Sequence, residues 1–321
     1  MSSRLRDDPD TLAVLVQQAA DAVDVRPSFL EKDFWAIEML RTAQPTRSIT
    51  LHGGDSADVS FLFKGGTSLS RAFGIVERFS EDIDLLAVFP DDTSNSARDR
   101  VLKQVHADVG AHLGLAPIPA GSTTGIKRFA TYQYPASYPD ADLTAGVLLE
   151  LGSRGGAHPS TEVSIRSMLA EVSTQQLGVA DDDWEEFAPF TAHVLAPERT
   201  LLEKLSALHT AAVTDSGRLS GTGRHLYDIH QLLGDRLVLD ALHALGTDGV
   251  AELAADVDAH SRAAGFAATP RPAEGFASSP AFQPGHLGIA GAYAGVGVLV
   301  YGSVPSLDAI LARIQEQAGL L

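Results

Sequence analysis

The chain has 321 residues, of which 45% are hydrophobic, and it carries a formal net charge of −17 at pH 7. This composition predicts a folded protein with an ordinary buried core, in one large domain or two. The absence of cysteine excludes disulfides, thiolate catalysis and cysteine-ligated zinc. The negative charge counts against a broad nucleic-acid-binding surface, because such surfaces are usually basic.

No run of the sequence reaches the about 18 apolar residues that a membrane-spanning helix needs. The N-terminal stretch MSSRLRDDPD also lacks the apolar region of a signal peptide. We therefore expect a cytoplasmic protein with no membrane partner.

Two helices are expected before the first strand. Apolar residues recur at helical spacing over residues 9–24. Ser28 is the expected N-cap of a second helix, and Glu31 follows at the position that completes a capping box. The charged run Glu31-Lys32-Asp33 is then interpreted as the solvated first turn of that helix, with part of a site as the alternative.

Residues 59–88 predict a strand, a tight glycine turn, a short helix and a second strand. The apolar run at 59–63 ends at Gly65-Gly66, and Thr67 or Ser68 is the expected cap of a helix over residues 69–75. A glycine turn that leads into a helix points free backbone N–H groups at an anion.

Asp82 and Asp84 stand at the start of the second of these strands, which is expected over residues 83–89. Side chains two residues apart in a strand lie on the same face. Two carboxylates held together in this way repel each other unless a cation lies between them. Oxygen ligands of this kind suit Mg²⁺, which usually takes one or two carboxylates together with water and substrate phosphates.

The next segments are expected to form a helix over residues 94–113, a loop over 114–124 and a strand over 126–134. That strand carries Lys127-Arg128 beside aromatic residues, a pattern that fits either a clamp for a base or phosphate or the charged end of an edge strand. Residues 144–151 predict a buried strand that contains Glu150. A buried carboxylate is costly unless it is paired or binds a metal, so Glu150 is a candidate functional residue.

Short strands are expected at residues 162–165 and 190–194, with a helix at 167–176 and a solvated acidic stretch at 181–186. A helix from Pro197 places its leucines on one face and the polar residues Glu198, Lys204 and His209 on the other. A Gly/Pro/Ser-rich segment at 263–285 either covers the active site or is mobile. Helices are expected at 287–300 and 306–317.

Three blocks of this sequence resemble those of the AbiEii/AbiGii-type, MenT-like nucleotidyltransferase toxins of toxin–antitoxin systems. The first is KGGTSLS with RFSEDIDL, the second is EKLSAL and the third is GRHLYDIHQLL. These toxins belong to the DNA polymerase β-like nucleotidyltransferase superfamily. The resemblance implies an α+β fold, with a mixed sheet flanked by helices and a C-terminal helical part. We place the nucleotidyltransferase domain at residues 1–195 and the helical part at 196–321.

The resemblance also implies roles for individual residues. The expected metal ligands are Asp82 and Asp84, with Glu150 as a third. The two aspartates are also catalytic, together with Lys204 and Asp228, and Arg224 is a plausible neighbour of Asp228. The residues expected to bind the nucleotide are Lys64, Gly66, Thr67, Ser68 and Lys204. Ser80 occupies a position where phosphorylation would regulate such an enzyme, since added negative charge beside the carboxylates would repel a nucleotide.

For the whole protein, the resemblance implies transfer of a nucleoside monophosphate from an NTP to the 3′ end of tRNA, with one or two Mg²⁺ ions. CTP is the suggested donor, the product tRNA would not be aminoacylated, and a cognate antitoxin would neutralise the enzyme. The alternatives are nucleotidylation of a protein or small molecule, kinase-like transfer of the γ-phosphate, and an inactive binding protein. A local rim of basic side chains remains compatible with an RNA acceptor despite the acidic total, and its members are Lys64, Arg71, Arg78, Lys127, Arg128, Arg154 and Arg166.

Overall fold

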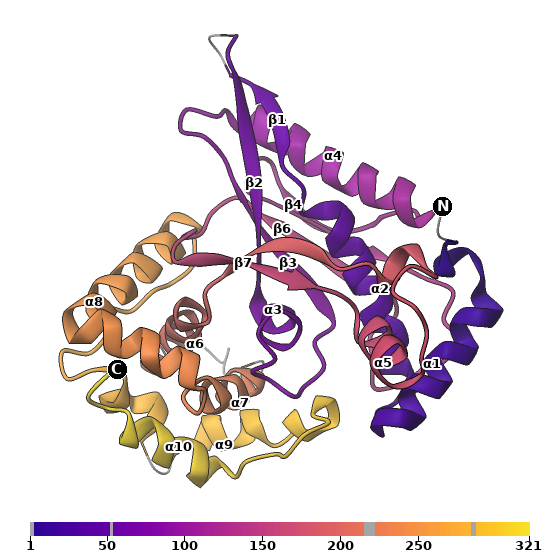
Figure 1. The fold of residues 1–321 in the computed structure, drawn as a ribbon. Helices are drawn as coiled ribbons and strands as arrows, with labels where there is room; N and C mark the ends of the chain where they lie inside the picture. The colour runs from indigo at the N-terminus through magenta and orange to yellow at the C-terminus, as the bar shows by residue number, and fades with distance from the viewer. Residues whose placement is uncertain (1–2, 52–53, 215–221, 284–286) are drawn as a thin grey trace. The chain divides into compact units, whose positions relative to one another are not determined.

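The computed structural model describes residues 3–51, 54–214, 222–283 and 287–321 (Figure 1). These residues form two compact units. The first unit comprises the described residues up to Ala72 together with Phe79–Ser153 and Ser160–Val194, and the second comprises Phe73–Arg78, Arg154–Pro159 and the described part of Leu195–Leu321. The expected division into functional domains at residue 195 stays a prediction. Within the described ranges, no helix is both long and apolar enough to cross a membrane.

The described residues of the first unit contain an eight-stranded sheet in the order β4-β5-β6-β3-β2-β8-β7, with β1 paired to β2. β3 is antiparallel to β2 and parallel to β6, and β8 is parallel to β2. This mixed sheet with flanking helices confirms the expected α+β fold. The strands are β1 (Arg47–Thr50), β2 (Ser56–Lys64), β3 (Asp82–Val88), β4 (Ile118–Thr123), β5 (Lys127–Tyr132), β6 (Val147–Gly152), β7 (Ser160–Ile165) and β8 (Phe190–Leu195).

The helices of the first unit cover one face of the central strands. The α-helices are α1 (Pro9–Val23), α2 (Pro27–Ala43), α3 (Gly65–Arg71), α4 (Asn95–Leu113) and α5 (Met168–Gln176), and η1 (Leu5–Asp7) and η2 (Glu185–Phe187) are short 3₁₀ turns. α1, α2 and α5 pack together, and α2 also packs on α4, β3 and β6 (Figure 1). Alternate residues of the central strands form the core, among them Phe63, Leu85 and Leu151. The polar residues of the same strands therefore lie on the other face.

The start of α2 differs from the sequence expectation. α2 begins at Pro27, and its N-terminus has no side-chain cap, so both the Ser28 cap and the Glu31 capping box are wrong. The Ser28 hydroxyl donates instead to Asp140 Oδ2 at 2.7 Å. The Glu31 carboxylate is fully buried and accepts hydrogen bonds from two backbone N–H groups in the loop at 137–138. A long-range contact has replaced the local one.

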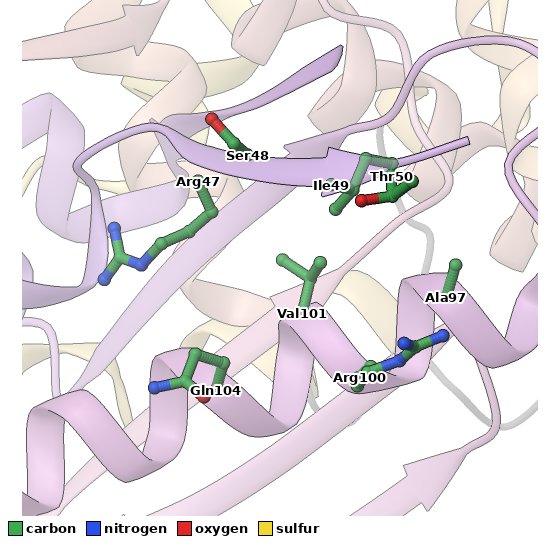
Figure 2. A pocket seen from close by; sticks show the side chains of 8 residues that line it. All are labelled: Arg47, Ser48, Ile49, Thr50, Ala97, Arg100, Val101 and Gln104. Atoms are coloured by element: carbon green, nitrogen blue, oxygen red, sulfur yellow. The ribbon is translucent and has the colours of Figure 1, made fainter. Parts of the chain in front are cut away.

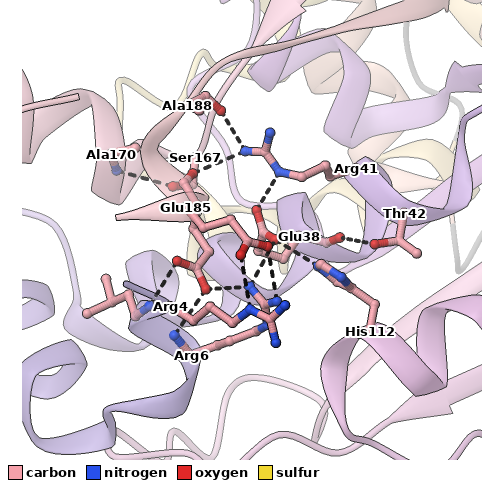
Figure 3. A network of polar contacts seen from close by, with 12 residues as sticks. Arg4, Arg6, Glu38, Arg41, Thr42, His112, Ser167, Ala170, Glu185 and Ala188 are labelled. Atoms are coloured by element: carbon pink, nitrogen blue, oxygen red, sulfur yellow. Dashed lines mark hydrogen bonds and ion pairs between the residues drawn. The ribbon is translucent and has the colours of Figure 1, made fainter. Parts of the chain in front are cut away.

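A buried network of charges joins the N-terminal segment to α2, α4 and η2 (Figure 3). The Arg6 guanidinium donates to the Glu186 carboxylate at 2.7 Å, and the same carboxylate accepts two backbone N–H groups of η1. Glu38 on α2 lies 3.1 Å from His112 on α4 and 3.9 Å from Arg6. Glu186 is buried, so the interpretation of 181–186 as a solvated stretch is wrong at its last residue.

The described part of the second unit is helical, apart from short connecting segments. Its helices are α6 (Pro197–Val213), α7 (Gly223–Leu232), α8 (Arg236–Ala263), α9 (Leu287–Tyr293) and α10 (Leu307–Glu316), with 3₁₀ turns η4 (Phe276–Ser278), η5 (Pro280–Phe282) and η6 (Val296–Leu299). The leucine face of α6 is fully buried, as expected, and α6 packs on α7 and α8.

The Gly/Pro/Ser-rich segment at 263–285 is partly a component of this core. Phe276 and Phe282 are fully buried, and the Phe276 N–H donates to the Leu321 carbonyl at 3.0 Å. The alternative of a mobile loop is therefore wrong for residues 276–282. Residues 284 and 285 of the expected segment lie outside the described residues.

Candidate active site

The carboxylates predicted from the sequence lie on one face of the central strands. Asp82 and Asp84 are the first and third residues of β3. The strand register pairs Asp84 with Lys64 on β2 and with Glu150 on β6. Directly paired residues of neighbouring strands point to the same face. The structure therefore brings Lys64, Asp84 and Glu150 into one row, with Asp82 beside it.

The electrostatics of this row fit a bound cation. Burial raises the pKa of Glu150, and the charges of Asp84 and Asp82 raise it further, to about 7, against the opposing effect of Lys127. A divalent cation between the carboxylates would allow all three to stay ionised. Mg²⁺ usually takes one or two protein carboxylates and completes its shell with water and substrate phosphates.

These carboxylates do not make a complete metal centre by themselves. Within the described ranges, no group of three or more histidine, aspartate or glutamate side chains forms such a centre. The assignment of Asp82, Asp84 and Glu150 as ligands therefore stays a prediction.

Gly65 provides the space that the Asp84 carboxylate occupies. Its φ of +82° is strained for residues with a side chain, and a Cβ at this position would clash with Asp84 Oδ2. Gly65 therefore fixes how closely the turn approaches the carboxylate. The family motif points to Gly66 and gives no role to Gly65, whose one local signal is its place directly after a strand.

α3 begins at Gly65, four residues earlier than the helix expected over 69–75, and Thr67 and Ser68 are not its caps. The Thr67 hydroxyl donates to the Asp82 carbonyl at 2.6 Å, which fastens α3 to the start of β3. The Ser68 hydroxyl donates to the Gly65 carbonyl at 2.9 Å. Both hydroxyls thus hold the turn, and their predicted contact with a triphosphate stays a prediction.

Two buried charges of α2 contact the end of α3 and the residues that precede β3 and β6. Lys32, which is 1% exposed, donates to Glu81 at 3.1 Å and to the Thr144 carbonyl at 2.7 Å. Asp33 lies 3.6 Å from the Arg71 side chain at the end of α3. Burial lowers the pKa of Lys32, and the charge of Glu81 opposes that shift. The interpretation of this run as a solvated turn is therefore wrong, because Lys32 and Asp33 are buried and bound to other segments of the unit.

A second cluster, in the second unit, joins the two other predicted residues. Arg78 donates to both oxygens of Asp228, at 2.6 and 2.7 Å, and Lys204 lies 2.8 Å from Asp228 Oδ2. All three side chains are buried, so the polar face expected for α6 at Lys204 is not solvated. Arg78 is not among the site residues expected from the motifs, although it opens the block RFSEDIDL.

The protonation of this cluster follows from its charges. Burial alone would raise the pKa of Asp228, but Lys204 and Arg78 together hold it well below its usual range. Burial, reinforced by the charge of Lys204, lowers the pKa of the nearby His225 to about 3. At neutral pH the cluster therefore contains one carboxylate, two cations and a neutral imidazole. Arg224 is partly exposed on α7.

Most arginines of the expected basic rim have a polar partner in the same unit. Its arginines contact acidic side chains or a carbonyl rather than forming one exposed surface. Their partners are Glu171 for Arg71, Asp228 for Arg78, Asp99 for Arg128, the Ala263 carbonyl for Arg154, and Asp181 for Arg166. The rim is therefore a weaker support for RNA binding than the sequence suggested.

Ser80 is partly exposed and lies two residues before Asp82 in the chain. Both of its neighbours are fixed, because the Phe79 ring stacks on Phe29 at 4.7 Å and Glu81 binds Lys32. The position is compatible with regulation by phosphorylation, which stays a prediction.

A separate hollow of about 340 Å³ lies between β1 and α4 (Figure 2). Its lining contains none of the predicted site residues and includes Arg47, Thr50, Arg100 and Gln104. The Arg47 guanidinium is already bound to Asp108 at 3.0 Å. We therefore do not interpret this hollow as the active site.

Comparison with known families gives one match that spans most of the chain. The matching family is described as "Nucleotidyl transferase AbiEii toxin, Type IV TA system", and the match covers residues 55–289. This range contains every predicted site residue, from Lys64 to Asp228. No curated protein matches the chain.

Proposed function

The chain belongs to the AbiEii family of nucleotidyl transferase toxins, and from this premise we propose that it transfers a nucleoside monophosphate from an NTP to the 3′ end of tRNA. The observation that carries the nucleotidyl transfer is the row of Lys64, Asp84 and Glu150, with Asp82 beside it and the Gly65 turn against it. The tRNA acceptor is proposed from the resemblance of the three sequence blocks. This face offers carboxylates for a metal and a turn for phosphates.

We assign Asp82, Asp84 and Glu150 to the binding of one or two Mg²⁺ ions. When bound, the metal would polarise the phosphate oxygens and lower the pKa of an attacking hydroxyl. Lys64, which pairs with Asp84 at the end of the row, would offset negative charge on the nucleotide. The backbone N–H groups of the glycine turn would bind phosphate oxygens, and the buried hydroxyls of Thr67 and Ser68 keep that turn in place.

Lys204 is assigned to the nucleotide phosphates on the strength of its family motif. For Asp228 we propose a positioning role. Its carboxylate is fully buried and bound by two cations, and its low pKa makes it a poor proton acceptor at neutral pH. Asp228 would therefore act by holding Lys204 and Arg78 in place.

The acceptor is tested with purified protein, Mg²⁺, total tRNA and each α-labelled NTP in turn. We expect label on tRNA, most strongly from CTP, and none on tRNA whose 3′ ribose has been oxidised with periodate. Aminoacylation of the labelled tRNA should be blocked. If no NTP labels intact tRNA, the proposed acceptor is wrong.

A second candidate acceptor is a protein or small molecule. It is favoured by the net charge of −17 and by the internal partners of the rim arginines, since RNA binding depends on cations that face the phosphates. In this case the α-label would appear in protein or metabolite fractions, and added tRNA would neither accept label nor compete for it.

We also propose that a cognate antitoxin counteracts this activity in the cell. Expression of the chain alone should then arrest growth, and expression of the Asp84→Ala variant should not. Co-expression of the antitoxin should restore growth with the unaltered chain. Arrest by the Asp84→Ala variant would show that toxicity does not come from the carboxylate face.

A further inference from the structure

Lys127 and Phe129 lie on the carboxylate face, although neither is given a role by the family motifs. β5 pairs with β6 so that Phe129 is opposite Glu150 and Lys127 is opposite Gly152. Because paired residues share a face, both side chains project on the side of Asp84 and Glu150. β5 also pairs with β4, which lies within residues 114–124, where a loop was expected. β5 is therefore not an edge strand, and that interpretation is wrong.

The contacts of Lys127 place its charge beside the carboxylates. Its Nζ lies 5.3 Å from the centre of the Phe129 ring, a cation–π distance that keeps the side chain along the strand. On the paired strand, Lys127 is opposite Gly152, two residues from Glu150. The next residue, Arg128, has the opposite orientation and donates to Asp99 on α4 at 2.9 Å. Only the lysine of this basic pair therefore faces the site.

The position opposite this lysine on β6 is open. Gly152, its cross-strand partner, has no side chain, and a Cβ at that position would meet no atom within 4 Å. Lys127 itself is partly exposed. The carboxylates thus lie between two lysines, with Lys64 paired to Asp84 on one side and Lys127 beside Glu150 on the other.

We propose that Lys127, supported by the Phe129 ring, is a phosphate-binding residue of this face. This inference rests on the proposed function and adds to it a contact with the substrate. A phosphate group is the chemistry that matches an amine next to an open position and a metal-binding face. The phosphate belongs either to the NTP or to the acceptor, and separate measurements distinguish these two sources.

The test measures the affinities for a non-hydrolysable NTP with Mg²⁺ and for tRNA, by equilibrium titration of wild type, Lys127→Ala, Lys127→Arg and Phe129→Leu. We expect Lys127→Ala to weaken one of the two affinities about 10-fold or more, the usual scale of a lost charged hydrogen bond. Lys127→Arg should recover part of the lost affinity, and Phe129→Leu should lower the affinity for the same ligand to a smaller extent.

Arg236→Ala is the matched control, because it removes one positive charge from a side chain that is 94% exposed, and it should change neither affinity. Unfolding curves identify any variant that fails to fold. Weaker NTP binding assigns Lys127 to the triphosphate, and weaker tRNA binding assigns it to the acceptor.

If both affinities are unchanged in Lys127→Ala, the proposal is wrong and the lysine only balances the charge of Glu150. Wild type that binds either probe without transferring nucleotide would refute the proposed function alone. Wild type that binds neither probe would refute both.

Discussion

Substitution of Gly65 by alanine tests whether the turn positions the Asp84 carboxylate. The added Cβ has two separate effects. It places an alanine at a φ of +82°, and it occupies the space taken by Asp84 Oδ2. The first effect is a general cost of the left-handed conformation, about 1–2 kcal/mol of unfolding free energy. The second is specific to the site.

Gly178 provides the matched control for this substitution. Its φ is +74°, and a Cβ there would meet no atom within 4 Å, so Gly178→Ala carries the conformational cost without a clash. Gly178→Ala should lose about 1–2 kcal/mol of unfolding free energy in urea, and Gly65→Ala should lose at least as much, because its clash adds to the conformational cost. In Gly65→Ala, Asp84 or α3 must also move. A displacement of about 1 Å at reacting groups can lower the rate about 100-fold.

The assay is the rate of nucleotide transfer to tRNA at saturating NTP and Mg²⁺, together with urea unfolding of each variant. We expect Gly65→Ala to fall about 100-fold in kcat, and Gly178→Ala to keep the wild-type rate. If Gly65→Ala transfers nucleotide as fast as Gly178→Ala, the contact with Asp84 has no role in catalysis.

Three further predictions follow from the charges. Asp228→Asn leaves two buried cations without a charged partner and should cost about 3–5 kcal/mol of unfolding free energy. Folding lowers the pKa of Asp228, so the stabilisation from its carboxylate is fully present above the ordinary pKa of 3.8. Urea unfolding should therefore show equal losses at pH 5 and pH 8. Folding raises the pKa of Glu150 from 4.5 to about 7, so the stability of the wild type should fall as pH rises between these two values. Glu150→Gln lacks this titration, and its melting temperature relative to wild type should therefore rise from pH 5 to pH 8. Added Mg²⁺ should remove this difference. Ser80→Asp should weaken NTP binding in calorimetry, whereas Ser96→Asp, which adds the same charge at an exposed position on α4, should not.

Local sequence patterns predicted the parts of the site that depend on regular spacing. The two-residue period placed Asp82 and Asp84 on one face, and the apolar run around Glu150 predicted a buried strand, whereas its place beside the Asp82 strand came from the family resemblance. Both results follow because strand geometry is set by residues next to one another in the chain. The family motifs, rather than spacing, selected Lys204 and Asp228, whose helices are amphipathic like many others.

The parts that sequence analysis missed depend on partners far away in the chain. Lys32 is stabilised by Thr144, 112 residues later, and Arg78 by Asp228, 150 residues later. A charged run at a helix start is normally solvated, and nothing local shows that distant carboxylates and carbonyls will surround it. The role of Gly65 was missed for the same reason, because the clash that excludes a side chain comes from the neighbouring strand.

The position of the transferred label tests the central claim most directly. Wild type and Asp82→Ala are incubated with Mg²⁺, total tRNA and either α-labelled or γ-labelled CTP. Nucleotidyl transfer on the carboxylate face predicts that wild type transfers the α-label and not the γ-label, and that Asp82→Ala transfers neither. Transfer of the γ-label would show a kinase-like reaction, and α-label transfer by Asp82→Ala at the wild-type rate would show that the reaction does not take place on this face.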